Sequence, residues 1–164
     1  MRGIILVLAV AACGSDDVYD LTGIYQVSAD VESMPCGADQ PIMNPPAYLK
    51  FHKEKDFGLN FFVYDECNDA AGTDCPSGGV HDSYVLGQKN GWTITETESS
   101  FGGSCTLTYI EGSALVTGKM LAIEHSEYSD SPNLTDPQCT TDEAGKRGKT
   151  MPCVDHYHLD AVKL

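Results

Sequence analysis

Short runs of β-branched and aromatic residues, separated by glycine, proline, asparagine and aspartate, fill most of this 164-residue chain. Apolar runs broken by turn-forming residues are typical of β-strands joined by tight connections. Helical periodicity is nearly absent beyond the N-terminal segment, so the pattern predicts an all-β domain. The strands are expected near residues 21–30, 47–54, 57–65, 81–88, 91–98, 104–110, 114–126 and 153–162.

Apolar and polar residues alternate within several of these runs. Leu49 and Phe51 flank Lys50, and the same alternation occurs from Trp92 to Ile94 and from Leu107 to Tyr109. Successive side chains of a strand point to opposite faces. The alternation therefore predicts antiparallel strands with one buried and one solvent-facing side.

Glycine-containing sequences indicate where the chain turns. Asn90-Gly91 between two strand-like runs is a strong hairpin signal. Glu111-Gly112-Ser113 is predicted to be a second tight connection, and Lys55-Asp56 a third. Gly118 interrupts the long run 114–126, which indicates either a bulge or another turn. Whether the domain has eight or nine strands depends on that glycine.

A sequence of about eight antiparallel strands has two exposed edges, and closure into a barrel removes them. The first run contains Gly23-Ile24-Tyr25, which resembles the Gly-x-Trp of lipocalin-like (calycin) barrels, with tyrosine in place of tryptophan. Residues 31–46 follow where those proteins have a loop over the barrel mouth. The resemblance implies an antiparallel up-and-down β-barrel and no particular ligand. A barrel without a cavity, or a two-sheet sandwich, would show the same sequence pattern.

The N-terminus has the pattern of an export signal. Arg2 precedes an apolar run, and the small residues of Val10-Ala11-Ala12 lead directly to Cys13. The ten residues from Gly3 to Ala12 are too few to span a bilayer, which needs about 20. Val10-Ala11-Ala12-Cys13 resembles the bacterial lipobox, whose cysteine is lipidated and becomes the mature N-terminus.

This resemblance implies a signal peptide at 1–12, a lipidated tether at 13–20 and a single β-domain at 21–164. It also implies a lipid-anchored protein of the bacterial cell envelope. Gly14 follows the cysteine where enteric lipoproteins retained in the inner membrane carry aspartate, so by resemblance the outer membrane is favoured.

Cysteine parity agrees with a lipidated Cys13. The chain has seven cysteines, and six are left when Cys13 is set aside. An exported domain with six cysteines is expected to form disulfides. The expected disulfide cysteines are Cys36, Cys67, Cys75, Cys105, Cys139 and Cys153. Six cysteines allow 15 connectivities. The favoured set among them is Cys67–Cys75, Cys139–Cys153 and Cys36–Cys105, because the first two pairs are close in sequence.

The chain is strongly acidic, with a formal net charge of −14 at pH 7. Phosphate backbones and anionic surfaces are repelled by such a field, which argues against nucleic acid as a partner. A solvated acidic surface is the simplest interpretation, with a cationic partner or calcium as alternatives. One acidic loop has carboxylates of the kind that bind calcium, but the spacing of these residues fits no EF-hand. Its carboxylates are Asp65, Glu66, Asp69 and Asp74.

His156, His158 and Asp160 are the candidate metal ligands, because residues two apart on a strand share a face. Tyr157 and Leu159 would then form the apolar face, which places both histidines on the outer side. We therefore predict solvated histidines, no metal site and no cofactor.

No Gly-x-Ser-x-Gly, His-Glu-x-x-His, P-loop or Gly-x-Gly-x-x-Gly motif occurs in the chain. The favoured hypothesis is a non-enzymatic envelope lipoprotein that binds a small molecule or peptide. A structural lipoprotein with a packed core and a protein partner is the first alternative. A metal-dependent enzyme using His156 and His158 is the second. An apolar cavity of ligand size at the barrel mouth would favour binding.

Overall fold

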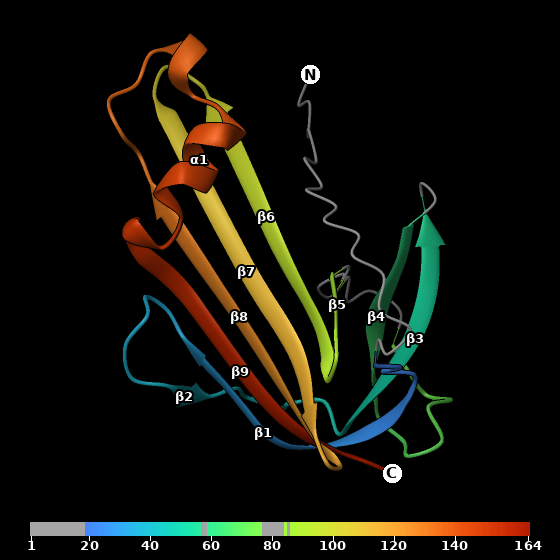
Figure 1. Cartoon of the computed structure of the whole chain (residues 1–164). Coiled ribbons are helices and arrows are strands. Elements are labelled where there is room, and N and C mark those ends of the chain that lie inside the picture. Colours follow the sequence, from blue (N-terminus) through green and yellow to red (C-terminus); the bar gives the residue numbers. More distant parts are fainter. Residues whose placement is uncertain (1–18, 57–58, 77–83, 85) are drawn as a thin grey trace.

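The chain folds into one strongly curved antiparallel sheet with a small helical segment on its outer face (Figure 1). The computed structural model describes residues 19–56, 59–76, 84 and 86–164. Its strands are β1 (Gly23–Ser33), β2 (Gln40–Pro41), β3 (Tyr48–Asp56), β4 (Leu59–Cys67), β5 (Leu86–Gln88), β6 (Gly91–Phe101), β7 (Cys105–Thr117), β8 (Met120–Asp130) and β9 (Cys153–Lys163). Its helical turns are η1 (Asp136–Gln138), α1 (Thr141–Arg147) and η2 (Gly148–Thr150).

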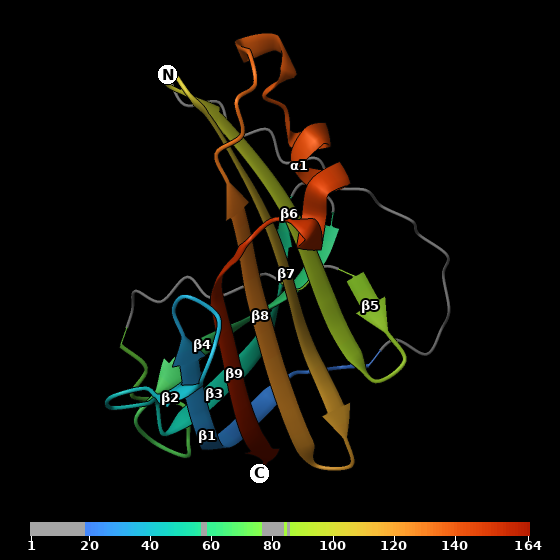
Figure 2. The same cartoon turned by 90° about the vertical axis from the view of Figure 1, so that its left-hand side faces the viewer.

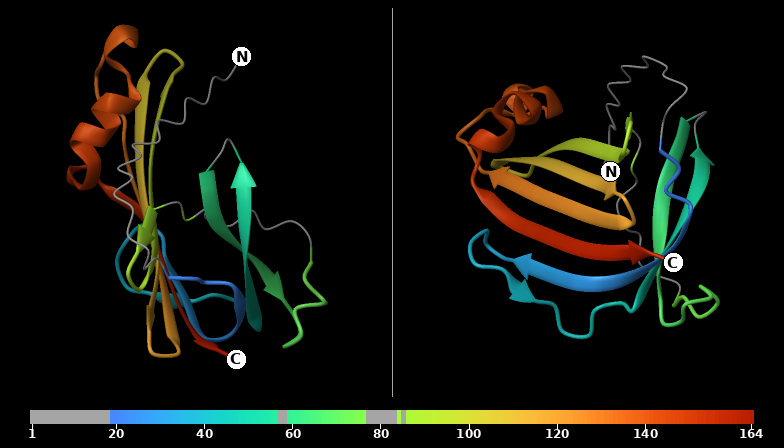
Figure 3. Two further views of the ribbon diagram at one scale, coloured as in Figure 1. Left: turned by 45° about the vertical axis from the view of Figure 1, so that its right-hand side comes forward. Right: turned by 60° about the horizontal axis from the view of Figure 1, so that its bottom comes forward.

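The strand order is β4-β3-β1-β9-β8-β7-β6-β5, with β2 paired to β1. The predicted all-β, up-and-down, disulfide-bonded architecture is thus confirmed. Full closure of the barrel is wrong for the described residues, because the sheet ends at β4 and β5. A single bridge between Phe62 and Tyr84 crosses this opening, with hydrogen bonds of 3.1 and 3.0 Å between their backbone groups. The view from below shows how far the sheet curls (Figure 3).

Of the turns predicted in the second half of the chain, one is wrong. The Asn90-Gly91 hairpin is confirmed, with Gln88 opposite Gly91. Glu111-Gly112-Ser113, in contrast, lies within the continuous strand β7 and pairs with β6 and β8. The chain turns at Gly118 instead, whose φ of +65° favours glycine. Glu111-Gly112-Ser113 is hydrogen-bonded to a strand on each side and stays extended. Residue 118, in contrast, needs the left-handed conformation.

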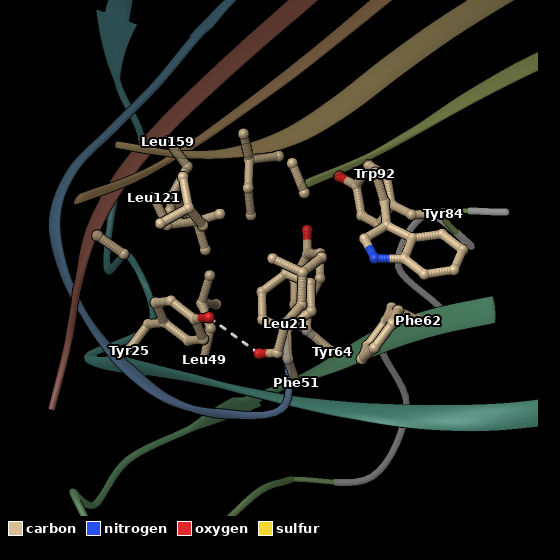
Figure 4. Close-up of a cluster of buried hydrophobic side chains, with 14 of the residues drawn as sticks. Leu21, Tyr25, Leu49, Phe51, Phe62, Tyr64, Tyr84, Trp92, Leu121 and Leu159 are labelled. Atoms are coloured by element: carbon tan, nitrogen blue, oxygen red, sulfur yellow. Dashed lines mark hydrogen bonds between the residues drawn. The ribbon is translucent and has the colours of Figure 1, made fainter. Parts of the chain in front are cut away.

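The main hydrophobic core lies on the concave face, between the β3–β4 pair and the long strands β6 to β9 (Figure 4). Tyr25, Leu49, Phe51 and Phe62 are fully or almost fully buried there. The rings of Tyr25 and Phe51 meet edge to face with centroids 5.5 Å apart, and the Tyr25 hydroxyl donates to the Leu21 carbonyl at 2.9 Å. The tyrosine of the lipocalin-like tripeptide is therefore a core residue.

A second, smaller core lies on the convex face. Leu107, at the start of β7, is fully buried beneath Ala144 of α1 and Met151, with Tyr109 packed against them. Figure 2 shows α1 lying along the outer side of β6 and β7. The alternation of Leu107 and Tyr109 thus predicted a buried face correctly, but this face is covered by the helical segment and not by the barrel interior.

Three disulfides join the described cysteines: Cys36–Cys153, Cys67–Cys75 and Cys105–Cys139. Only Cys67–Cys75 agrees with the favoured set, and the partners of the other four cysteines are exchanged. Sequence proximity was a poor guide because the helical segment folds back over β7, which places Cys139 beside Cys105. The β1–β9 register, in which Ser33 lies opposite His156, places Cys36 beside Cys153.

This connectivity predicts the linked peptides of the oxidised protein. Proteolysis without reduction should release peptides that join Cys36 to Cys153 and Cys105 to Cys139, and mass spectrometry should identify both. Thiol labelling under denaturing, non-reducing conditions should find no free thiol among these four cysteines, since export leads to an oxidising compartment. A peptide linking Cys139 to Cys153 would contradict the structure.

Candidate functional site

On the concave face of the sheet, the side chains of β1, β8 and β9 change from apolar to polar along the strands. Opposite residues of paired strands share a face. Leu121 of β8 lies opposite Ala161 of β9 in the apolar part, whereas His125 lies opposite Tyr157 further along. Glu32 of β1 lies opposite Tyr157 as well. The strands that bury the core at one end therefore carry ionisable side chains at the other.

These polar side chains line a cavity of about 370 Å³. Its walls are formed by β1, β4, β8, β9 and the segment after β2. The lining residues are Asp30, Glu32, Ile42, Asn44, Pro46, Tyr64, Glu66, His125, Asp155 and Tyr157. The volume is in the range of small-molecule sites. The lining mixes polar and apolar groups, however, whereas an apolar cavity was the expected sign of ligand binding.

Asp30 is the most deeply buried acidic residue of this cavity, with 7% of its surface exposed. Burial raises the pKa of its carboxyl, the hydrogen bond with Tyr157 lowers it, and the nearby Glu66 and Glu32 raise it further, so that the pKa lies above its usual range. Asp30 Oδ1 has no hydrogen-bond partner among the described residues. A buried carboxylate oxygen in that state is costly, which marks Asp30 as a candidate binding group.

Two further groups share this environment. Asp155 also has a buried Oδ1 without a hydrogen-bond partner within the described part of the chain. Burial raises the pKa of the Tyr157 hydroxyl, and so do Tyr64 and Asp30 beside it. Tyr157 therefore stays protonated, and its hydroxyl can donate a hydrogen bond to a carboxylate. The cavity thus holds a hydrogen-bond donor, aromatic rings and several acidic groups.

The three sequence-predicted metal candidates lie on the opposite, convex face. His158 Nδ1 is 2.7 Å from Glu124 Oε1, and His158 Nε2 is 3.2 Å from Asp160 Oδ2. His156 makes a 3.1 Å hydrogen bond with Ser126. The outward orientation follows the predicted register, because Leu159 and Ala161 between them are fully buried. Among the described residues, no group of three or more histidine, cysteine or acidic side chains is arranged to hold a metal.

The carboxylates of the predicted acidic loop do not converge on one point. Asp69 accepts hydrogen bonds from the backbone N–H groups of Thr73 and Asp74, at 2.8 and 3.1 Å. Hydrogen bonds from Thr73 and Asp74 hold the pKa of Asp69 below its usual range. Asp65 faces His52 on the outer side, at 3.5 Å, whereas Glu66 lines the cavity.

Most of the cavity was not found from the sequence. Of its acidic residues the sequence singled out only Glu66, as part of an acidic loop. Asp155 lies two and four residues before Tyr157 and Leu159, an even spacing that keeps it on the inner face of β9. Asp30 lies three residues after Val27, and only the register shift between Val27 and Ala29 turns it to the inner face. Spacing was therefore a signal for Asp155 but not for Asp30.

Compared with known proteins, the chain matches no family model, no curated protein and no solved structure. Cys13 and the preceding segment lie outside the described residues. No helix in the described part of the chain has the length and apolarity needed to cross a bilayer.

The His158 pair predicts a pH-dependent contribution to stability. Burial lowers the pKa of His158, but hydrogen bonds and charges from Asp160 and Glu124 raise it more, so the net pKa lies above its usual value. A folded-state pKa above the unfolded value stabilises the fold below about pH 6.5, and this stabilisation is lost as the pH rises through the folded-state pKa. His158→Gln should therefore lower the free energy of unfolding more at about pH 6 than at about pH 9, by less than about 1 kcal/mol for a half-exposed pair.

Chemical denaturation of both proteins at the two pH values measures this difference. Glu124→Gln should reduce the same pH dependence, because it removes one of the two carboxylates. An equal effect of His158→Gln at both pH values would show that the imidazolium contributes nothing.

Proposed function

We propose that this protein is a lipid-anchored bacterial envelope protein whose β-domain binds a small molecule and performs no reaction on it. The observation that carries the proposal is the cavity between β1, β4, β8 and β9. Its volume of about 370 Å³ suits a small ligand. Asp30 Oδ1, buried there without a hydrogen-bond partner among the described residues, offers a polar contact of the kind that orients a ligand.

Membrane anchoring is supported by the lipobox-like Val10-Ala11-Ala12-Cys13 and by cysteine parity. The six cysteines from Cys36 to Cys153 pair with one another. None of them needs Cys13 as a disulfide partner, so this thiol is left for lipidation. Gly14 after the cysteine favours the outer membrane on the resemblance to enteric lipoproteins. On this proposal the binding domain works at a membrane surface and not in free diffusion.

Cys13→Ala tests the anchor. We expect the wild-type protein in the membrane fraction with a lipid-modified mass, because the acyl chains partition into the bilayer. The variant should lack the lipid modification, and its β-domain should keep the native circular dichroism spectrum. A wild-type protein that is wholly soluble at the mass of the unmodified chain would refute the lipoprotein assignment.

Ile42→Trp tests the cavity. Ile42 lines it, and its backbone N–H donates to the Asp30 carbonyl at 3.1 Å, so a larger side chain there should occupy ligand space. Spermidine, 1,8-octanediol and suberate are suitable probes, since they have similar lengths and are cationic, neutral and anionic. We expect at least one of them to bind the wild-type domain saturably in ligand-observed NMR, and we expect Ile42→Trp to weaken this binding.

Val31→Trp is the matched control, because Val31 pairs with the outward-facing His158 and so lies on the other face of β1. It should leave binding unchanged. If no probe binds, or if the two variants weaken binding equally, the cavity is not the binding site.

A further inference from the structure

The cavity is acidic on several sides. Four of its lining residues carry carboxylates, namely Asp30, Glu32, Glu66 and Asp155. They come from β1, β4 and β9, which are separated in sequence but brought to one concave face by the strand registers. No lysine or arginine is among the described residues that line the cavity. The charge of these carboxylates is therefore not offset by a basic residue of that kind in the lining.

An acidic surface alone indicates solvation, but here two carboxylate oxygens are also buried. Only 7% of the surface of Asp30 is exposed, and its Oδ1 has no hydrogen-bond partner among the described residues. The Oδ1 of Asp155 is in the same situation. A buried carboxylate oxygen without a hydrogen-bond donor is unfavourable even where the other oxygen of the group is bonded, as in Asp30 with Tyr157, so a donor with positive charge would be bound preferentially at these two atoms.

The two oxygens lie at different places along the cavity. Asp30 lies opposite Leu159 on the neighbouring strand, and Asp155 precedes Leu159 by four residues. At the rise of a β-strand, the backbones that carry the two carboxylates are offset by roughly 13 Å. Glu32, opposite Tyr157, lies between them on the same face. A ligand that meets both carboxylates is therefore elongated.

The cavity also discriminates between kinds of cation. Among the described residues no group of acidic, histidine or cysteine side chains is arranged for a metal ion. Tyr64 and Tyr157 line the cavity, and aromatic rings attract ammonium and guanidinium groups. An anion would meet four carboxylates, and a neutral molecule would bring no positive charge to the Oδ1 atoms of Asp30 and Asp155.

We propose that the cavity binds an elongated organic polycation of the polyamine class, with one ammonium group donating to Asp30 Oδ1 and another to Asp155. This inference deepens the proposed function and rests on it. The aliphatic carbons between the ammonium groups would lie against Tyr157 and Ile42. No covalent step is involved, and the ligand is held by charge-assisted hydrogen bonds and contacts with the rings.

Isothermal titration calorimetry with spermidine tests the proposal on the wild-type domain and two variants. Asp30→Asn and Asp155→Asn keep the size of each side chain and remove one charge. A hydrogen bond to a charged group justifies an expected loss of about tenfold or more in affinity for each variant. Near-ultraviolet circular dichroism verifies that both variants fold.

Asp160→Asn is the matched control. Asp160 lies on β9 like Asp155, but on the convex face beside His158, so its removal lowers the net negative charge equally without touching the cavity. Spermidine affinity should change less than about twofold, because exposed charges act through screened solvent. An equal loss in all three variants would show diffuse attraction to an acidic surface and overturn the proposal.

Three comparison ligands separate this inference from the proposed function. n-Butylamine, with a single ammonium group, should bind much more weakly than spermidine, and equal affinity would overturn the two-point arrangement. If 1,8-octanediol or suberate binds, is blocked by Ile42→Trp, and spermidine does not bind, the cavity is a binding site but the charge assignment is wrong. If none of the ligands binds, both proposals fail.

Discussion

Strand β1 connects the two halves of the sheet, and the rest of the structure depends on its pairing. Its first residues, Gly23 to Gln26, pair with β3, whereas Tyr25 to Ser33 pair with β9. A register shift between Val27 and Ala29 interrupts the second pairing. Such an irregularity bends a strand and increases its twist. Because β1 changes neighbours along its length, its first half joins the β3–β4 pair to the sheet beside the packed core. Its second half diverges from β3 and borders the cavity.

Apolar packing and an acidic cavity thus share one concave face. Aromatic rings fill the first part, where Phe62 and Trp92 meet at a centroid distance of 4.9 Å. The second part buries Asp30, which works against folding because its Oδ1 loses hydration without gaining a hydrogen bond from the described residues. Stability has to come from elsewhere, and the core, the second cluster beneath α1 and three disulfides provide it. Buried polar groups that oppose stability are typical of binding sites.

The convex face has a different role. At the start of β7, the helical segment covers Leu107 and is held to that strand by the Cys105–Cys139 disulfide. Arg147 at the end of α1 is 3.0 Å from Glu143 and 3.4 Å from Asp130. These contacts give the long connection between β8 and β9 a folded structure. The helical segment stiffens the sheet from its convex side and does not enter the cavity. His125 and Tyr157 lie on the concave side of the same sheet.

The sequence by itself determined the strands and most of their faces. Alternation has a period of two and is a local property, so Leu49, Phe51 and Leu159 were placed correctly on the buried side. It also placed His158 outward. The turn at Asn90-Gly91 was identified from local chemistry as well. The acidic loop and the outer histidines were considered as metal ligands for the same reason, because residues that are close in sequence can be recognised without knowledge of the fold.

Only the tertiary structure decided which strands meet, which cysteines bond and where a site forms. Cys36 and Cys153 are 117 residues apart, and only the β1–β9 register brings them together. In the described part of the chain the barrel is open between β4 and β5, where the Phe62–Tyr84 bridge stands in place of a longer strand pairing. Asp30 and Asp155 become a candidate site through the same register. Each looks like an ordinary acidic residue within its own strand, since burial and the lack of a partner depend on segments far away in the chain.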